Sequence, residues 1–582
     1  MMHIAKPLPA AAASLIWRQA PALVVFSFLV NLLLLVSAIY MLQVYDRVLS
    51  SGSLDTLVWL TAAALAAMVV YGLLEHVRRL MLGRIGYWLE TELSGPVIRR
   101  TMQARLAGTK TDASLRDVGD LRAFMAGEPI LAFLDAPWAP VFIGLLWFLH
   151  PALGVLATAG AAVLFLAALT NDLLTRKRQQ RSAAILRASQ TSVAHYVENA
   201  ETISALGMTG AVIGRWQERQ REAGAEQQRL AETTAAIGNV SRALRLALQT
   251  MILGLGAYYV LQGQLTSGGM VAGSIILGRA LAPVERSIAA WRGLVAAAAA
   301  RRNLDRLFGP AEIARDPFPL PRPQGWLAVQ SLHYTAPQSQ HPVLKSITFA
   351  LEPGQVCAVV GPSGAGKSTL CRLIVGAWKP AYGHIRLDGA EVSTWHSEDL
   401  GQYIGYLPQQ VVLFPGSVAQ NIARLRSADS ADVIAAARLA GVHEMILRLP
   451  DGYETDIGVH GDRISTGQRQ RLGLARALFG DPSLIVLDEP NANLDSEGDQ
   501  ALLQTLLALK QKGRTIVIVT HQQRMLQVCD MTLVLMEGQV TGFGKRDDAL
   551  AALASSTRKP RDGAARTADD PLAARPKLVK AE

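Results

Sequence analysis

The sequence predicts an α-helical membrane domain of six spans with long cytoplasmic helices, fused to a soluble α/β domain. Two observations support this prediction. The first half contains uncharged apolar stretches long enough to cross a bilayer, and the second half alternates short β-branched runs with helical stretches. The composition, 50% hydrophobic and 18% charged, excludes disorder over most of the 582 residues. Three scattered cysteines exclude a disulfide scaffold and fit a reducing cytoplasm.

The first four spans precede residue 175. The uncharged run 23–42 is long enough to cross a hydrocarbon core of about 30 Å and exceeds the apolar part of a cleaved signal peptide. A second span covers 57–75. The 36 residues of 136–171 contain no Asp, Glu, Lys or Arg, which is too long for one span. Because His150-Pro151 interrupts this stretch, we expect two helices, the first beginning near Pro129.

Spans five and six form a second helical hairpin. The 33 residues of 246–278 also lack these four charged types, and the glycines within 262–269 break the stretch near its middle. The sixth helix is predicted to end near Trp291.

The distribution of Lys and Arg predicts the orientation. Nine lie in 76–127 and eleven in 173–245, whereas the opposite side has essentially Arg47 alone. The positive-inside rule therefore places both long segments and both termini in the cytoplasm. The net charge of +10 follows mostly from topology, and no nucleic-acid partner is expected.

The soluble half contains a glycine-rich phosphate-binding pattern between an apolar strand and a helical run. Its residues are Gly361, Pro362, Ser363, Gly364, Ala365, Gly366, Lys367 and Ser368, followed by Thr369. This is the G-x-x-x-x-G-K-[ST] motif in its proper context, in which backbone N–H groups and the helix N-terminus bind phosphates. Lys367 is predicted to reach the β- and γ-phosphates of ATP, and Ser368 to ligate Mg²⁺. A glycine-rich turn that arose by chance would not explain why the preceding strand, Lys367 and the Ser368 hydroxyl occur together.

A second strand, 484–487, ends in two acids. Asp488 is predicted to hold Mg²⁺ through water, and Glu489 to polarise the water that attacks the γ-phosphate. The alternative, a pair of solvated turn acids, is disfavoured by the phosphate-binding motif upstream.

The segment 464–471 (ISTGQRQR) resembles the signature of ABC transporters. Four other residues resemble that family's motif positions, in the family's order: Tyr334 (adenine-stacking aromatic), Gln409 (Q-loop glutamine, near Mg²⁺), Asp495 (D-loop aspartate) and His521 (switch histidine). The resemblance implies an ABC-type ATPase coupled to transport. It further implies that Ser465, Gly467 and Gln468 contact ATP held by the other subunit, and hence a homodimer.

Two positions depart from the family pattern. Thr466 stands where the signature usually has glycine, and Val459 stands where such exporters often have glutamate. Slower turnover and an altered contact between subunits are the expected consequences.

Four further segments resemble the type I protein secretion ATPases: 40–57, 134–142, 278–285 and 491–495. The resemblance implies export of polypeptides with C-terminal signals across the bacterial inner membrane, together with a periplasmic membrane-fusion adaptor and an outer-membrane channel. About 20 residues precede the first span, so no N-terminal peptidase domain is expected. A lipid or drug exporter is the alternative. A soluble ATPase acting on nucleic acid is disfavoured by the six spans.

Arg279 lies near mid-bilayer in the sixth span, where a charge is costly and marks a cavity or a partner. It is predicted either to pair with Asp135 or Glu285, or to line a wet channel and contact the passing polypeptide. The expected organisation is an N-terminal cytoplasmic segment (1–20), the membrane domain (21–309), a proline-rich linker (310–324), the ATP-binding domain (325–548) and a disordered tail (549–582).

Overall fold

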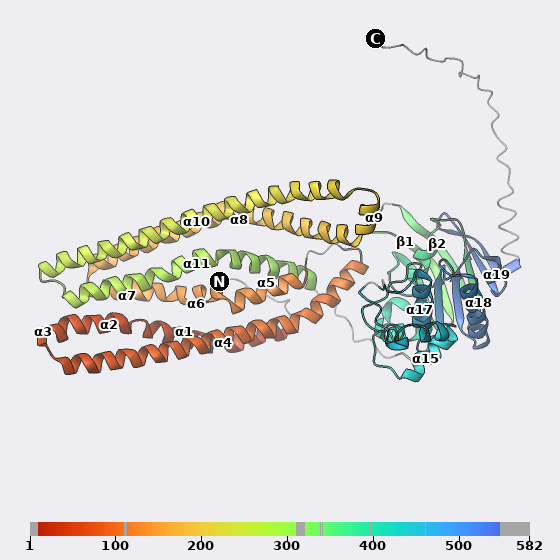
Figure 1. Ribbon diagram of the computed structural model, residues 1–582, viewed down its shortest axis with the longest axis horizontal. Helices are drawn as coiled ribbons and strands as arrows, with labels where there is room; N and C mark the ends of the chain where they lie inside the picture. Colours follow the sequence, from red (N-terminus) through yellow and green to blue (C-terminus); the bar gives the residue numbers. More distant parts are fainter. Residues whose placement is uncertain are drawn as a thin grey trace, which may run out of the picture. The chain divides into compact units, whose positions relative to one another are not determined.

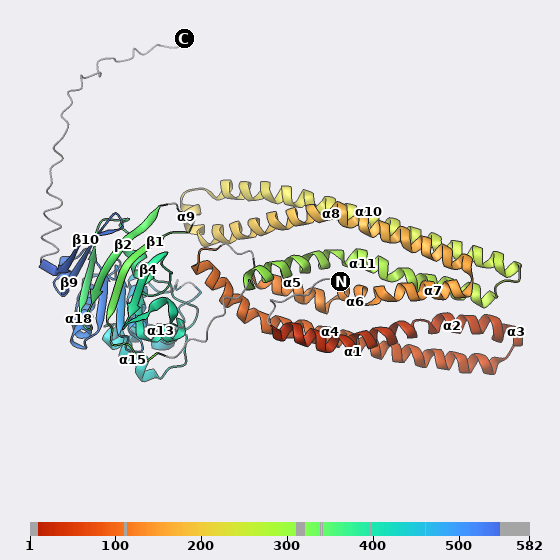
Figure 2. The same ribbon diagram turned by 180° about the vertical axis from the view of Figure 1, so that it is seen from behind.

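The computed structural model describes residues 10–109, 113–309, 320–337, 339, 341–395, 397–459, 461 and 463–547. They form a helical unit and an α/β unit, both drawn in Figures 1 and 2. The boundary falls at residues 312 and 313, inside the predicted linker, of which 310–319 lie outside the described residues. The predicted tail also lies outside them.

Within its described residues, the helical unit contains six helical segments that are long and apolar enough to span a membrane, so this prediction is confirmed. Its elements are α1 (Ala10–Leu33), α2 (Val36–Gln43), the π-helical turn η1 (Val44–Val48), α3 (Leu49–Ser51), α4 (Leu54–Leu106), α5 (Leu115–Ala126), α6 (Glu128–Asp135), η2 (Ala136–Trp138), α7 (Ala139–Leu149), α8 (Pro151–Glu198), α9 (Ala200–Ala205), α10 (Thr209–Leu261) and α11 (Ser267–Phe308).

The helix breaks have identifiable local causes. His150 is extended, and its Nδ1 accepts the N–H of Ala152 at 3.2 Å, which caps α8 directly after α7 ends. The hydroxyl of Thr266 accepts the N–H of Gly269 and caps α11 in the same way. Both hairpins therefore turn where the sequence predicts.

The long helices extend far beyond a bilayer. α4 and α10 have 53 residues each, which corresponds to about 80 Å. The predicted end of the sixth helix near Trp291 is wrong, since α11 continues to Phe308. The residues after Trp291 are mostly alanine, leucine and arginine, which favour helix, and Gly309 follows the last turn.

α11 is the central helix of the unit. It packs against α2, α5, α6, α7, α8 and α10, and α8 lies alongside α10 in both views. Leu146, Leu153, Ile252, Leu277 and Leu281 are fully or almost fully buried in the core between these helices.

The α/β unit contains two sheets, and its parallel sheet was predicted. The four-stranded sheet is antiparallel in the order β2-β1-β4-β5; the six-stranded sheet has the order β10-β9-β3-β8-β7-β6 and is parallel except for β10. The strands are β1 (Leu327–Thr335), β2 (Pro342–Leu351), β3 (Val356–Val360), β4 (Tyr382–Leu387), β5 (Ala390–Glu391), β6 (Ile404–Leu407), β7 (Leu484–Asp488), β8 (Thr515–Val519), β9 (Met531–Met536) and β10 (Gln539–Lys545).

Helices and short helical turns connect these strands. They are α12 (Lys367–Ile374), η3 (Val392–Thr394), α13 (Ser397–Tyr403), α14 (Val418–Ile422), α15 (Ser430–Leu439), α16 (His443–Leu447), η4 (Gly452–Glu454), α17 (Thr466–Leu478), α18 (Ser496–Gln511) and α19 (Gln523–Leu526).

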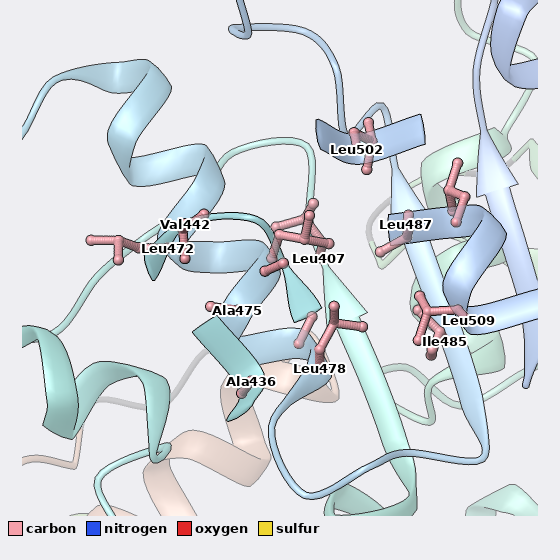
Figure 3. Packing of buried hydrophobic residues seen from close by; sticks show 14 of the residues in the cluster. Leu407, Ala436, Val442, Leu472, Ala475, Leu478, Ile485, Leu487, Leu502 and Leu509 are labelled. Carbon is pink, nitrogen blue, oxygen red and sulfur yellow. The ribbon is translucent and has the colours of Figure 1, made fainter. Parts of the chain in front are cut away.

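Alternate residues of the central strands pack on opposite faces of the large sheet. Ile485 and Leu487 join the core formed with α15, α17 and α18, part of which Figure 3 shows. Leu484 and Val486 join the core formed with α12 and the smaller sheet. Burial on both faces explains why these strands read as continuous apolar runs.

Candidate functional site

The carboxyl ends of four parallel strands meet at one edge of the large sheet. β3, β8, β7 and β6 are neighbours in this order and pair in parallel, so the segments that follow them leave on the same side. Asp488 is the last residue of β7, and the segments after β3, β8 and β6 carry Lys367, His521 and Gln409, so residues of four separate motifs meet at this edge. The fold therefore gathers predicted residues that are far apart in the sequence.

Steric constraints require glycine at two positions of the turn between β3 and α12. A Cβ at Gly361 would lie 2.1 Å from the carbonyl oxygen of Leu535. Gly366 has a φ of +98°, and a Cβ there would lie 2.7 Å from the Leu344 side chain. Lys367 is buried, and its Nζ donates to two carbonyl oxygens of the turn at 2.7 and 3.0 Å. The turn thus holds the ammonium group among its own backbone atoms.

The other predicted residues of this turn are arranged from its tip into the helix. Pro362, Ser363 and Gly364 are exposed, Ala365 is buried, and Ser368 and Thr369 are half-buried in the first turn of α12. The exposed tip and the helix N-terminus together present backbone N–H groups, as phosphate binding requires.

Asp488, at the end of β7, is the buried acid of the site. It is 1% exposed, and neither carboxylate oxygen has a hydrogen-bond partner in the described part of the chain. Burial raises the pKa of this carboxyl and the charge of Glu489 adds to the shift, whereas the Ser368 hydroxyl, which lies close without forming a well-aligned hydrogen bond, and the cations of Arg372 and Lys367 oppose it. Two buried oxygens without donors fit a hydrated Mg²⁺ ion, because a carboxylate buried alone is costly.

Glu489 adopts a backbone conformation that is rare for glutamate, with a φ of +50°. Its N–H donates to the carbonyl oxygen of Val519 at 3.1 Å, and its Oε2 accepts from Nε2 of Gln409 at 2.9 Å. The backbone of Glu489 is therefore held by β8, and its carboxylate is held by Gln409, which follows β6. His521 is exposed two residues after Val519, and among the described residues no hydrogen bond joins it to Glu489.

Ser465 and Gln468 form a reciprocal cap at the start of α17. The hydroxyl of Ser465 accepts the N–H of Gln468 at 3.3 Å, and Oε1 of Gln468 accepts the N–H of Ser465 at 3.0 Å. A Cβ at Gly467 would lie 3.0 Å from the carbonyl oxygen of Asn493. Ser465 and Thr466 are exposed, so the positive end of the α17 dipole carries an accessible hydroxyl.

Asp495 caps α18, and its contacts include a residue outside the predicted site. It accepts from the N–H of Gly498 and from the Arg471 guanidinium, and both contacts hold the pKa of this carboxyl below its usual range. Gln470, also outside the predicted set, is buried and donates to the carbonyl oxygen of Pro490 at 3.2 Å. Both residues stand in the signature segment itself, which is the signal that would have identified them.

Tyr334 lies on Trp378, with ring centroids 5.2 Å apart and ring planes 13° apart. The Arg372 guanidinium lies 4.7 Å from the centroid of the Trp378 ring. The sequence patterns gave no indication of a role for Trp378. Only 6% of Tyr334 is exposed, so stacking on an adenine requires local opening at the face opposite Trp378.

The signature and the phosphate-binding turn occupy different parts of the sheet. α17 packs against α14, α15 and β6, whereas α12 packs against β2, β7 and β8.

The sequence pattern of ABC transporters matches residues 344–492, and that of the ABC transporter transmembrane region matches 21–281. The type I secretion system ATP-binding protein PrsD of Rhizobium meliloti is 39% identical over 93% of this chain and 94% of its own length. The chain belongs to the ABC transporter family.

Other similar proteins agree with this family. The cyclolysin secretion/processing ATP-binding protein CyaB of Bordetella pertussis is 29% identical over 90% of this chain and 75% of its own length. A bacterial Atm1-family ABC exporter, solved with ATP bound, matches with a TM-score of 0.80 over 95% of this chain and 100% of that chain, at 21% identity. This ABC transporter is thus a multi-pass membrane protein whose nucleotide-binding domain binds and hydrolyses ATP to drive transport.

In the membrane unit of the transporter, both acids considered for Arg279 pair elsewhere. Glu285 lies 2.9 Å from the guanidinium of Arg245, and Asp135 lies 2.7 Å from that of Arg78. Arg279 is half-buried and has no ion pair or hydrogen bond with any residue that the structure describes. The structure therefore contradicts the ion-pair alternative, and the channel role of Arg279 stays a prediction.

Proposed function

We propose that this transporter is the ABC component of a type I secretion system and exports polypeptides with C-terminal signals across the bacterial inner membrane. The observation that supports this most strongly is the 39% identity to PrsD over almost the full length of both chains. This similarity favours polypeptide export over the export of lipids or drugs. Its partners would be a periplasmic membrane-fusion adaptor and an outer-membrane channel, and its nucleotide domain would lie in the cytoplasm.

The catalytic roles follow from chemistry at the sheet edge. Lys367 and the backbone of residues 361–369 would bind the ATP phosphates. Glu489 would orient and polarise the attacking water, with Gln409 holding its carboxylate and His521 contacting the γ-phosphate. Ser368, Gln409 and Asp488 would hold Mg²⁺, which neutralises phosphate charge when bound.

A homodimer would complete each ATP site. The exposed hydroxyl of Ser465 and the α17 dipole suit a γ-phosphate, but α17 and the phosphate-binding turn pack over different strands of one chain. A second copy would bring Ser465, Gly467, Gln468 and Asp495 to the ATP held by the first.

Hydrolysis is tested by Glu489→Gln in the purified transporter with Mg²⁺. We expect turnover to fall by about 100-fold or more, with the affinity for a fluorescent ATP analogue retained, because the change removes only the carboxylate that acts on water. Lys367→Ala is the matched control and should lose nucleotide affinity. Undiminished turnover in Glu489→Gln would refute the role of Glu489.

Export is tested by deleting the gene in its host and comparing the secreted proteins. We expect polypeptides to disappear from the medium and to return with the wild-type gene but not with Lys367→Ala. Fusing the C-terminal segment of one such polypeptide to a reporter should make its secretion depend on this transporter. An unchanged set of secreted proteins, with altered lipid or drug export, would favour the alternative.

A further inference from the structure

An uncompensated charge lies inside the membrane unit. Arg279 stands twelve residues after the start of α11, about 18 Å along the helix and near the middle of a hydrocarbon core of about 30 Å. It has no partner within the described residues, and a charge at this depth must be hydrated or paired. The side chain therefore requires a wet cavity or a ligand of opposite charge.

A second arginine lies on the same face of α11. Arg286 is seven residues further on, which is almost two full turns and about 10 Å along the axis. Its side chain is 58% exposed, and its only ion pair in the described chain is with Oδ2 of Asp135 at 3.8 Å, beyond hydrogen-bond distance. Most of its donors are therefore available to another acceptor.

Pro283 lies between the two arginines and leaves one backbone carbonyl oxygen of the helix without its usual N–H donor. It stands four residues after Arg279 within the helix, where a residue with an N–H would donate to the Arg279 carbonyl oxygen. This face of α11 thus combines two cationic groups with a carbonyl oxygen that lacks its usual donor. A polypeptide, which carries both carboxylates and N–H donors along its length, matches this combination.

The position of α11 argues against a lipid, and the pairing of nearby acids argues against a second copy of the chain, as the ligand of these two arginines. Among the six spans found in the described residues it has the largest buried share, 50% of its most apolar window, and helices contact it from several sides, so α11 is the most enclosed of the spans and the least suited to a lipid ligand. A second copy of the chain offers Glu75, Asp135 and Glu285 on the cytoplasmic half of its spans, and each of these is already paired within its own chain.

We propose that Arg279 and Arg286 form a binding site for carboxylates of the exported polypeptide. This inference depends on the proposed function and names the chemical group of the exported polypeptide that the membrane unit would recognise. A chain in the polyproline II conformation has three residues per turn and a rise of about 3.1 Å, which places side chains three residues apart on one side and about 9 Å from each other, so the site suits acidic side chains at this spacing. A substrate carboxylate at Arg286 would compete with the long contact to Asp135.

The test uses the full-length transporter in lipid nanodiscs and short fluorescent peptides measured by anisotropy. The acidic peptide carries two aspartates three residues apart, its neutral twin has asparagines, and a third has lysines. We expect the acidic peptide to bind more tightly than the neutral one, by about fivefold for each arginine, which corresponds to about 1 kcal/mol. Arg279→Gln and Arg286→Gln should each remove one such factor, and the double variant should remove the preference.

Two variants separate binding from folding. Arg302→Gln, on the same helix but beyond the span, is the matched control and should keep the preference for the acidic peptide. Replacing both site arginines with glutamate should transfer the preference to the lysine peptide, which a merely structural role would not do.

The possible outcomes are distinct. Equal binding of acidic and neutral peptides by the wild type would overturn the anion site and leave polypeptide export intact. Binding of none of the peptides would count against the proposed function itself. A preference that survives in the double glutamine variant would place the anion site elsewhere, and loss of bound anionic lipid in that variant, seen by native mass spectrometry, would assign the arginines to lipid phosphate instead.

Discussion

Replacing Asp135 with asparagine should destabilise the membrane unit strongly. The Asp135 side chain is 6% exposed, and its Oδ1 lies 2.7 Å from Nη1 of Arg78, which is 3% exposed. Removing one partner of such a buried pair costs about 3–5 kcal/mol. We expect a cost at the lower end of this range, about 3 kcal/mol, because asparagine has the same shape as aspartate and because Glu75 stays 2.6 Å from Arg78. At about 2–3 °C per kcal/mol, the melting temperature should fall by roughly 6–9 °C.

Tryptophan fluorescence during heating at a fixed rate in detergent measures this change. Nε1 of Trp138 donates to Oγ of Ser27 at 3.3 Å, and Ser27 contacts Asp135, so one tryptophan lies beside the pair. Glu90→Gln is the matched control: it breaks an ion pair with Arg122 whose side chains are 35% and 48% exposed. Exposed pairs contribute at most about 1 kcal/mol, so its melting temperature should change by under about 3 °C.

The double variant Arg78→Met with Asp135→Leu decides whether the pair itself is responsible. Apolar replacement of both partners of a buried pair is often neutral or stabilising, and Glu75 keeps its ion pair with Arg79 at 2.8 Å, so the double variant should recover most of the loss caused by Asp135→Asn. A melting temperature of Asp135→Asn equal to that of the wild type, or a double variant less stable than Asp135→Asn, would refute the reasoning.

Two further predictions concern the nucleotide domain. Because burial raises the pKa of Asp488, its ionisation costs folded-state stability above that pKa. Asp488→Asn without nucleotide should therefore melt above the wild type at pH 8, with the difference shrinking as the pH falls through the carboxyl range, and an opposite trend contradicts this. Ser465→Ala should lose about 1 kcal/mol of capping energy and also ATPase activity, whereas Ser417→Ala, which breaks an equivalent cap on α14, should lose stability alone. Equal ATPase activity in the two variants would argue against a phosphate contact by Ser465.

The sequence predicts those parts of the fold that depend on local patterns. The uncharged stretches, the break at His150-Pro151 and the strand before the phosphate-binding turn each depend on neighbouring residues, and the structure has them where they were expected. The end of α11 was misplaced because apolarity marks only the membrane part of a helix. Alanine and arginine continue α11 in water to Phe308, where hydropathy gives no signal.

The charge partners inside the membrane unit could not be predicted in this way. Charge counting included Arg78 among the nine cations of 76–127 that indicate orientation and gave no partner for it, and the structure shows it buried against Asp135, 57 positions later. Helix packing, and not depth in the bilayer, chooses these partners: α10 brings Arg245 to Glu285, and α4 brings Arg78 to Asp135. Both acids that the sequence offered to Arg279, Asp135 and Glu285, are thereby paired with other arginines. An arginine left over by this pairing is costly unless water or a bound ligand compensates its charge, and this makes the face of α11 around Pro283 the place to look for substrate recognition.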